Sequence, residues 1–151
     1  MLWPSHILLT DAICHRFLGV NDTFTLVATG FGAVFPDWME YVGGKRVLRH
    51  RGVSHNPYMW ILILWVVMGI KYVCERVPSL YVWGYDIDYL WAYFRWFMVG
   101  LFMHLAEDSL TMTGIPLTPF FRKRFALRLF ATGSWKEAVL LVGVVVLCFV
   151  V

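Results

Sequence analysis

Three of the five histidines in this chain of 151 residues fall in two short polar blocks. One block reads His50-Arg51-Gly52-Val53-Ser54-His55-Asn56-Pro57, and the other reads Gly100-x3-His104-x3-Asp108. Both blocks lie at the ends of strongly apolar runs, as does Pro36-Asp37 earlier in the chain. Imidazole and carboxylate groups are ligands that Zn²⁺ and Mn²⁺ accept. Because polar residues at the margin of a membrane span cost free energy to keep there, they indicate a function.

Within the second block, His104 and Asp108 are four residues apart, so on a helix they share one face and can bind one metal ion. Glu107 would point about 100° away from them. In the first block, Gly52 suits a turn that brings His50 and His55 together. Asp37 would add a carboxylate at a helix end. One metal with open positions, or two metals close together, would fit such a set.

The composition is that of a membrane protein. The sequence is 60% hydrophobic and 18% aromatic but only 15% charged, with a mean hydropathy of +0.65. Soluble domains are nearer about 45–50% apolar and about 25% charged. The length fits a single domain, residues 1–151. Three cysteines at no motif spacing indicate buried thiols rather than a disulfide framework.

The apolar runs predict an all-α integral membrane bundle of four to five short helices. The first two runs, 6–19 and 24–35, are shorter than the roughly 30 Å hydrocarbon core requires, and the second should end at Pro36. These two runs are expected to form a hairpin. Longer runs at 58–74 and 89–106 predict membrane spans, and the run 138–151 predicts a short C-terminal helix.

Basic residues gather in two segments that the two predicted spans separate, so both segments should emerge on one face of the membrane. They are Lys45, Arg46, Arg49 and Arg51 in the first segment, and Arg122, Lys123, Arg124, Arg128 and Lys136 in the second. The positive-inside rule makes that face cytoplasmic. The polar blocks fall on the same face, and the expected hairpin would return His6, but not His15, to it.

Simpler interpretations exist for each feature. A single histidine at a membrane interface is more often a hydrogen-bonded polar residue than a ligand. Basic residues there mostly set topology and contact anionic lipids. Asp11, inside the first run, is either a ligand or a carboxylate paired with Arg95. Several ligand types from separate segments on one face favour the metal site.

Three stretches together resemble the bacterial family of LexA-regulated, inner-membrane metal-dependent hydrolases (domain of unknown function 457), over roughly residues 5 to 119. They are Phe35-Pro36-Asp37, His50-Arg51-Gly52-Val53-Ser54-His55-Asn56 and Gly100-x3-His104-Leu105-x2-Asp108-x4-Thr113-Gly114-x-Pro116. The family pattern is a PD motif, then HRGxTHS, then HxxxDxxTxxG followed by proline. By this match the implied metal ligands are Asp37, His50, His55, His104 and Asp108, with His6 as a weaker candidate, in segments 37–57 and 100–119.

The resemblance implies a divalent metal, zinc first and manganese second, and a multi-pass protein of the bacterial inner membrane. The order of the motifs is also similar to zinc-dependent phospholipases C, which implies a phosphodiester substrate. Two departures stand out. Family members often carry a second Asp two residues after the PD aspartate, where this chain has Met39 followed by Glu40. Ser54 and Asn56 replace the usual Thr and Ser.

Two functional hypotheses follow. In the first, the protein is a metal-dependent hydrolase at the cytoplasmic face, acting on a membrane-proximal phosphoester such as a phospholipid head group. Arg51 or Arg49 would neutralise the phosphate, and Glu40 or Glu107 would be the general base. In the second, it is a non-enzymatic membrane subunit in which the cluster is a structural metal or hydrogen-bond site and apolar faces contact protein partners.

A transporter or channel is disfavoured because the ionisable residues gather at one face. Membrane lipids are the expected partners, and no nucleic-acid partner is expected.

Overall fold

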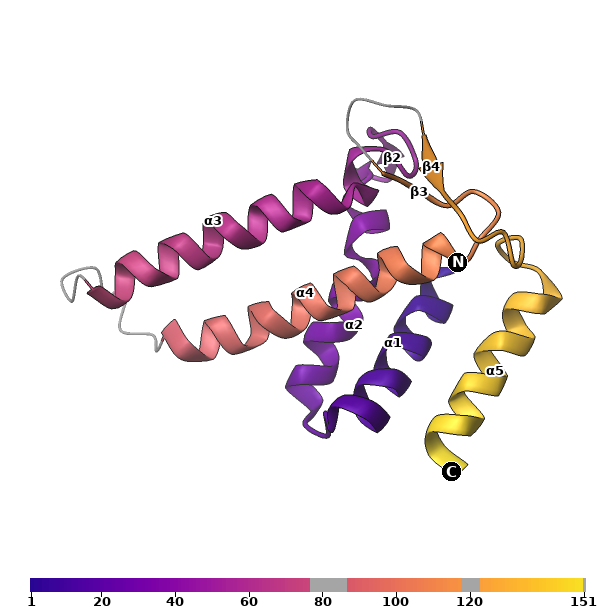
Figure 1. Ribbon diagram of the computed structural model, residues 1–151, viewed down its shortest axis with the longest axis horizontal. Coiled ribbons are helices and arrows are strands. Elements are labelled where there is room, and N and C mark those ends of the chain that lie inside the picture. Colours follow the sequence, from indigo (N-terminus) through magenta and orange to yellow (C-terminus); the bar gives the residue numbers. More distant parts are fainter. Residues whose placement is uncertain (77–86, 118–122, 151) are drawn as a thin grey trace.

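Five helices dominate the computed structural model, which describes residues 1–76, 87–117 and 123–150 (Figure 1). They are α1 (Trp3–Leu18), α2 (Thr23–Trp38), α3 (Pro57–Arg76), α4 (Ile87–Ser109) and α5 (Trp135–Val150). Each helix lies on one of the apolar runs, so the mostly helical fold predicted from the sequence is confirmed. Basic residue Arg122 of the predicted cytoplasmic face lies outside the described residues.

The remaining elements are short. Strands β1 (Tyr41–Val42) and β2 (Lys45–Arg46) form one antiparallel hairpin, and β3 (Ile115–Pro116) pairs in antiparallel fashion with β4 (Arg124–Phe125). A 3₁₀ turn, η1 (Val53–His55), precedes α3. The β1–β2 turn is Gly43-Gly44, with φ of 56° and 76°. A two-residue hairpin turn with positive φ at both positions favours glycine there. Strands of two residues are too short to show an alternating pattern of apolar and polar residues in the sequence.

Helices α1 and α2 form the predicted hairpin. Asp22 caps the start of α2, where its Oδ1 accepts a hydrogen bond from Thr25 N at 2.8 Å. The expected helix end at Pro36 is wrong, because α2 continues to Trp38. Proline removes one backbone hydrogen bond from the helix, but the backbone bonds resume after it, from Met39 N to Phe35 O at 2.9 Å. The hairpin places the start of α1 and the end of α2 at the same end of the molecule (Figure 1).

Helix α4 crosses α2 at very short range. A Cβ on Gly32 of α2 would overlap the carbonyl oxygen of Phe97, and a Cβ on Gly100 of α4 would overlap that of Thr29. Only glycine permits backbones to approach this closely. The apolar core beside this crossing is built around Met98, Leu101 and Leu105 of α4, with Trp60, Ile115 and partly buried neighbours from α2. The crossing fixes which residues of α4 face the ends of α1 and α2.

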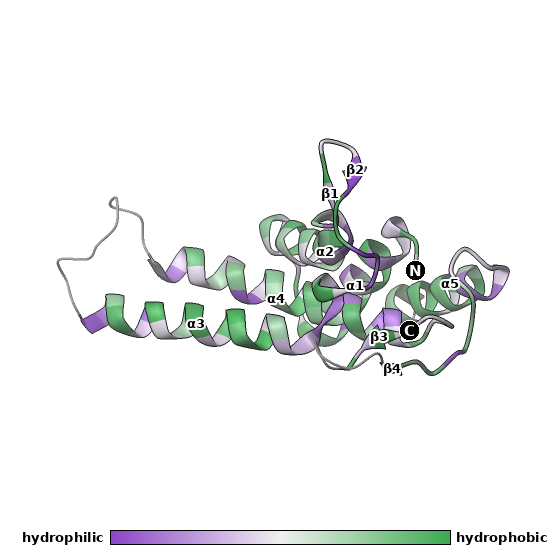
Figure 2. Cartoon of the chain, turned by 90° about the horizontal axis from the view of Figure 1, so that it is seen from above, coloured by the Kyte–Doolittle hydropathy of each residue, from purple (hydrophilic) through white to green (hydrophobic). Residues whose placement is uncertain are grey.

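Helix α3 and the first half of α4 leave the bundle side by side as an apolar arm (Figures 1 and 2). Among the described residues, α3 is the one helix long and apolar enough to cross a membrane. Trp60 is the only buried residue of this fully described helix, and Trp65 is 76% exposed. The predicted second span, in α4, does not meet the same test.

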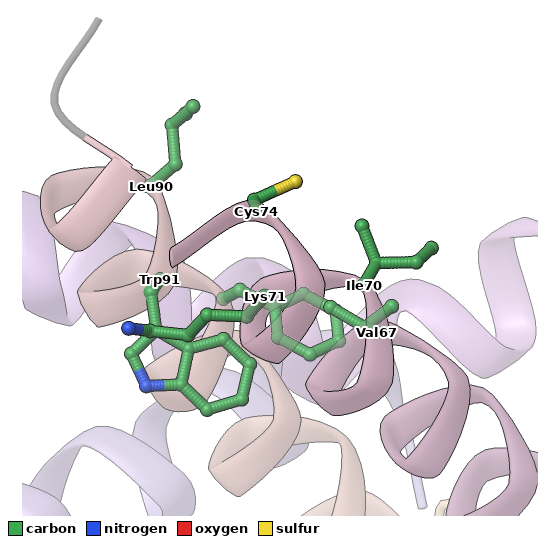
Figure 3. A pocket seen from close by; sticks show the side chains of 7 residues that line it. Val67, Ile70, Lys71, Cys74, Leu90 and Trp91 are labelled. Carbon is green, nitrogen blue, oxygen red and sulfur yellow. The ribbon is translucent and has the colours of Figure 1, made fainter. Parts of the chain in front are cut away.

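A groove of about 390 Å³ runs between α3 and α4 in this arm (Figure 3). Its walls are mostly apolar, and Lys71 lies at one side with its Nζ 3.1 Å from Asp88 Oδ1 and bonded to Glu75. The lining residues are Val67, Ile70, Lys71, Cys74, Leu90, Trp91 and Phe94. The groove is therefore far from the polar blocks, which lie at the opposite ends of both helices.

Candidate metal centre

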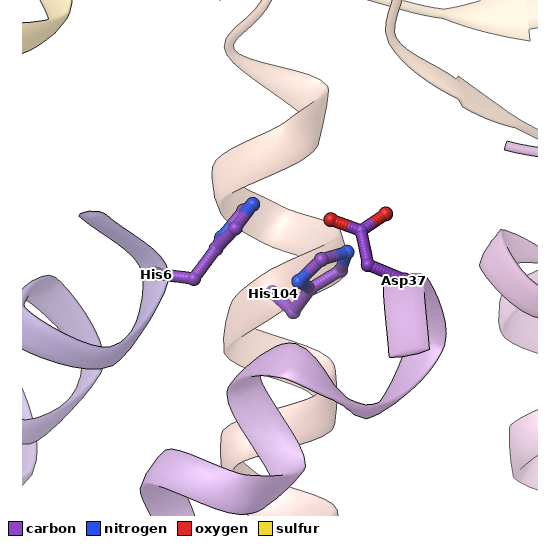
Figure 4. A group of neighbouring side chains, drawn as sticks. All are labelled: His6, Asp37 and His104. Carbon is purple, nitrogen blue, oxygen red and sulfur yellow. The ribbon is translucent and has the colours of Figure 1, made fainter. Parts of the chain in front are cut away.

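The predicted ligands converge at the end of the bundle where four elements meet. They are His6 from the first turns of α1, Asp37 from the last turn of α2, His55 from η1, and His104 and Asp108 from the C-terminal part of α4. All five are buried, with exposed fractions between 0 and 5%. Figure 4 shows His6, Asp37 and His104 reaching toward one another from three separate helices. Overlapping sets of three of these groups have ligand atoms within 4.8 Å of one another.

The α2–α4 crossing fixes the orientation of the His104 ring. Its Nδ1 lies 2.6 Å from the backbone oxygen of Ala33 in α2. A carbonyl oxygen only accepts, so Nδ1 carries the proton and the neutral ring has its lone pair at Nε2. That Nε2 lies 3.0 Å from Nε2 of His55 and 3.8 Å from Oδ2 of Asp108. His104 is thus oriented with a ligand atom toward the centre of the cluster.

His55 is oriented in the same sense by Glu40 and Ser54. Its Nδ1 is 2.9 Å from Ser54 Oγ and 3.3 Å from Glu40 Oε1. Its Nε2 faces Oδ1 of Asp37 at 3.3 Å and Oδ2 of Asp108 at 3.4 Å. Burial alone would lower the pKa of His55, but hydrogen bonds to Asp108, Asp37 and Glu40 raise it to about 10. Without a metal ion, the site therefore carries a proton on the nitrogen of His55 that would otherwise bind the cation.

His6 completes the pattern from α1. Its Nδ1 lies 2.5 Å from Glu107 Oε2, and Thr10 donates to the other oxygen of Glu107 at 3.1 Å. Its Nε2 lies 3.5 Å from Asp108 Oδ1, and its ring sits against that of His104 with centroids 4.0 Å apart. The expectation that the hairpin returns His6 to the polar blocks is met.

In all three imidazoles, Nδ1 therefore hydrogen-bonds to a group outside the cluster, and Nε2 faces the centre of the cluster. Metal-binding histidines are oriented in this way by carboxylates or backbone carbonyls behind them. In the described part of the chain, His6 Nε2, Asp37 Oδ1 and Asp108 Oδ2 are buried without a hydrogen-bond partner. Leaving a buried polar atom unpaired costs roughly 1–3 kcal/mol, more when the group is charged. A divalent cation is a partner that such nitrogen and carboxylate atoms accept, so the residues fit a metal ion.

Asp108 is itself held by a buried arginine. Its Oδ1 accepts from Arg51 Nη2 at 2.7 Å and from the amino nitrogen of Met1 at 2.6 Å. The second terminal nitrogen of Arg51, Nη1, donates to Thr111 Oγ1 at 2.7 Å and to Thr113 Oγ1. Arg51 is only 3% exposed. The guanidinium predicted to meet a phosphate is thus paired with the carboxylate of Asp108, whose Oδ2 faces the imidazoles of His55 and His104.

Glu40 is fully buried beside the cluster and contacts both histidines of the first block. Its Oε1 accepts from Arg51 N at 2.9 Å and Ser54 Oγ at 2.8 Å, and its Oε2 lies 2.8 Å from His50 Nδ1. Burial would raise the pKa of Glu40, but hydrogen bonds from His55, His50 and Ser54 lower it to about 2. Met39 packs against the apolar core instead. A buried carboxylate therefore lies one residue after the position where the family pattern has its second Asp.

His50 differs from the other predicted ligands because it lies at the rim. Its side chain is 44% exposed, and its Nδ1 is 3.7 Å from Asp37 Oδ1. It belongs to none of the three buried groups formed by described residues. Arg49 is exposed nearby. His50 is therefore the member of the set that connects the buried groups with the surface.

Some contributors escaped the sequence reasoning. Thr10 and the Ala33 carbonyl contact predicted ligands without belonging to a recognisable pattern. Ser54 and Thr111, by contrast, lie in the family motifs and could have been named. Asp11 accepts a hydrogen bond from Thr29 Oγ1 at 2.9 Å, away from the cluster. This hydrogen bond gives Asp11 neither of the two roles expected for it, which were metal ligand and partner of Arg95.

Comparison with known proteins gives one family. The model of the YdjM inner membrane protein family matches residues 1–151, the whole chain. The chain belongs to this family, which is the LexA-regulated inner-membrane family that its motifs resemble. No curated protein matches the chain. No solved structure matches it either.

Proposed function

We propose that this member of the YdjM inner membrane protein family is a metal-dependent hydrolase that cleaves phosphoesters at the cytoplasmic face of the inner membrane. The observation that carries the proposal is the convergence of three imidazole Nε2 atoms with the carboxylates of Asp37 and Asp108, in which the three imidazoles and Asp108 are each oriented from behind by a hydrogen-bonded partner. Nitrogen and carboxylate ligands together suit zinc first and manganese second.

His6, His55, His104, Asp37 and Asp108 would hold the ion. When bound, a divalent ion supplies a Lewis acid and lowers the pKa of coordinated water toward neutrality. Glu107 and Glu40 hold the imidazoles of His6 and His55 in the ligand orientation. Their contacts support an orienting role for both carboxylates, in place of the general base expected from sequence. Arg51 fixes Asp108 in the same way.

The phosphoester substrate is supported by charge and by location. Lys45, Arg46 and Arg49 are exposed on the β1–β2 hairpin and the loop that follows it, beside the His50 rim. Arginine suits phosphate oxygens because its fork donates two parallel hydrogen bonds. The apolar arm of α3 and α4 would enter the bilayer from this end of the molecule, as the positive-inside rule requires. A lipid head group or another membrane-proximal phosphoester would then meet the rim.

A turnover assay tests this function. The purified full chain, loaded with zinc or manganese in lipid nanodiscs, is incubated with phospholipids and with bis(p-nitrophenyl) phosphate. We expect hydrolysis in wild type, its loss in His104→Ala, and its retention in the control His15→Ala, because His15 lies at the far end of α1. Absence of hydrolysis in folded, metal-loaded wild type would contradict the proposal.

The second candidate is a non-enzymatic membrane subunit with a structural metal. Near-complete burial of His6, His55, His104 and Asp108 favours it, because a structural metal needs no open position. The arm of α3, apolar and largely exposed, would then contact a protein partner. The same variants discriminate between the two functions. In a structural subunit, loss of the metal would lower stability or assembly, and the wild-type protein would hydrolyse no ester.

A further inference from the structure

We propose that the protein self-associates in the membrane, with Arg95 on helix α4 of one copy pairing with Asp11 in a groove between α1 and α2 of another. This inference concerns an interaction surface, and it depends neither on the metal centre nor on hydrolysis. A second copy of the chain is the partner because each copy carries both halves of the charge pair.

Asp11 lies in an open, mostly apolar groove of about 390 Å³ between α1 and α2. Its Oδ1 accepts the hydrogen bond from Thr29 Oγ1 at 2.9 Å, and no described residue forms a hydrogen bond or an ion pair with its Oδ2. Gly30 has no side chain to cover this oxygen, and a Cβ there would lie 3.4 Å from it. A carboxylate oxygen of Asp11 is therefore accessible from outside the molecule.

Arg95 is an opposite charge that also lacks a partner. It is exposed on the apolar arm, and half-buried Trp91 and Val99 lie one helical turn to either side of it. It forms no hydrogen bond or ion pair with any residue that the structure describes. Charged residues within apolar membrane segments normally face the protein interior and pair there, because an unpaired charge is costly in hydrocarbon. An arginine that faces outward here therefore indicates a partner outside the copy to which it belongs.

Asp11 and Arg95 do not pair with each other within one copy, although both lie in the described part of the chain. The α1–α2 hairpin and the α3–α4 arm leave the polar end of the molecule in different directions (Figure 1). A contact between the two residues must therefore join unlike surfaces of two copies. Such a head-to-tail contact continues from copy to copy, or closes into a ring.

The depths of the two charges are compatible with this pairing. His6 and His104 mark the polar end of the molecule, where their ring centroids are 4.0 Å apart. Asp11 follows His6 by five residues and Arg95 precedes His104 by nine, which is about 8 Å and about 14 Å along the two helices. The long stem of arginine lies along apolar surface while its head group reaches a polar site. Two copies with the same orientation in one membrane therefore bring Arg95 within reach of Asp11.

Energy transfer between donor-labelled and acceptor-labelled copies of the full chain in liposomes tests this pairing. Asp11→Asn keeps the size of the side chain and an acceptor for Thr29, and Arg95→Met keeps an unbranched side chain. We expect transfer in wild type and a dissociation constant raised on the order of 30-fold or more in each variant, because one member of a desolvated charge pair is lost. Arg16→Met and Glu75→Gln, at exposed positions, are the controls and should associate like wild type.

A mixture of the two variants gives the most specific readout. Asp11→Asn retains Arg95, and Arg95→Met retains Asp11, so the mixture can form one charge pair in each dimer. At a protein-to-lipid ratio between the wild-type and variant dissociation constants, we expect each variant alone to be monomeric and the equimolar mixture to form dimers. Circular dichroism checks that both variants fold.

Three outcomes would contradict the proposal. Monomeric wild type would overturn self-association, and association that both variants leave unchanged would assign it to another surface. A mixture that associates no better than its components would overturn the contact between Arg95 and Asp11. None of these outcomes bears on the metal centre, whose ligands include neither residue.

Discussion

The Nε2 atoms of His55 and His104 lie 3.0 Å apart in a closed interior, although each ring already uses its Nδ1 elsewhere. His104 donates through Nδ1 to a carbonyl oxygen, so the Nε2 of its neutral ring directs a lone pair at His55. A proton on the Nε2 of His55 avoids a clash of lone pairs, and the hydrogen bonds to Asp108, Asp37 and Glu40 that raise the pKa of His55 to about 10 favour that proton. A metal ion removes the conflict because it replaces that proton and binds both lone pairs. Metal binding and deprotonation of ligands are coupled in this way in general.

The carboxylate behind His6 should control metal affinity. Glu107→Gln weakens the hydrogen bond to His6 Nδ1 but keeps the size of the side chain. Loss of such a partner typically costs about 10–100-fold in affinity, and we expect a zinc dissociation constant raised by that factor in competition with a chelator. Glu75→Gln, a 52% exposed position on α3, is the control and should bind zinc like wild type. Equal affinities for both variants would remove Glu107 from the site.

The buried Arg51–Asp108 pair should matter for stability. Arg51→Met leaves Asp108 without its 2.7 Å guanidinium contact in a buried environment. Breaking one side of a buried ion pair costs about 3–5 kcal/mol. Unfolding followed by tryptophan fluorescence in detergent should show a loss of this size. Arg49→Met, at an exposed position, should stay within about 0.5 kcal/mol of wild type; a comparable loss there would point to a nonspecific effect of charge.

The α2–α4 crossing depends on glycine. In Gly100→Ala the new Cβ overlaps the carbonyl oxygen of Thr29, so the helices must separate. Forced overpacking costs about 1–3 kcal/mol, and the shift should also loosen the contact between His104 and Ala33. Thermal unfolding should show the loss. Gly69→Ala is the matched control, since no atom lies within 4 Å of its Cβ; alanine there should be neutral or stabilise α3 by up to about 1 kcal/mol. Similar effects of both substitutions would contradict the close crossing.

Membrane topology can be read from the two ends of the α3 helix. In a background without cysteines, Lys45→Cys marks the β1–β2 hairpin and Glu75→Cys marks the far end of the arm. An impermeant thiol reagent should label the first only from the cytoplasmic side and the second only from the opposite side. Labelling of both from one side would contradict a spanning α3.

The sequence predicted those parts of the site that follow from local spacing. His104 and Asp108 share a helix face because they are four residues apart, and the apolar runs located all five helices. Glu107 was expected to point about 100° away from this face and so to be less likely to join the pair. It supports the site nevertheless, because α1 packs on that side and brings His6 within 2.5 Å. Only tertiary packing decides such a contact.

Position 39 shows a second limit of prediction from the sequence. The family pattern places a carboxylate there, and its replacement by methionine argued against a full set of carboxylates. In the fold, Met39 turns into the apolar core, and Glu40, one residue later, enters the site. The reason is the β1–β2 hairpin, which reverses the chain directly after α2 so that His50 and Arg51 return to Glu40. The two-residue strands show no alternating pattern, so Gly43-Gly44, a pair that favours hairpin turns, was the local signal from which this reversal could have been predicted.

Metal content tests the central claim most directly. Wild-type protein purified in detergent, beside the double variant His55→Ala/Asp108→Asn, is measured by inductively coupled plasma mass spectrometry, with circular dichroism as the check on folding. The buried convergence of imidazoles predicts at least one zinc or manganese ion per wild-type chain and none in the buried position of the variant. Well-folded wild type without metal, even after reconstitution with both ions, would contradict the metal centre and the hydrolase function built on it.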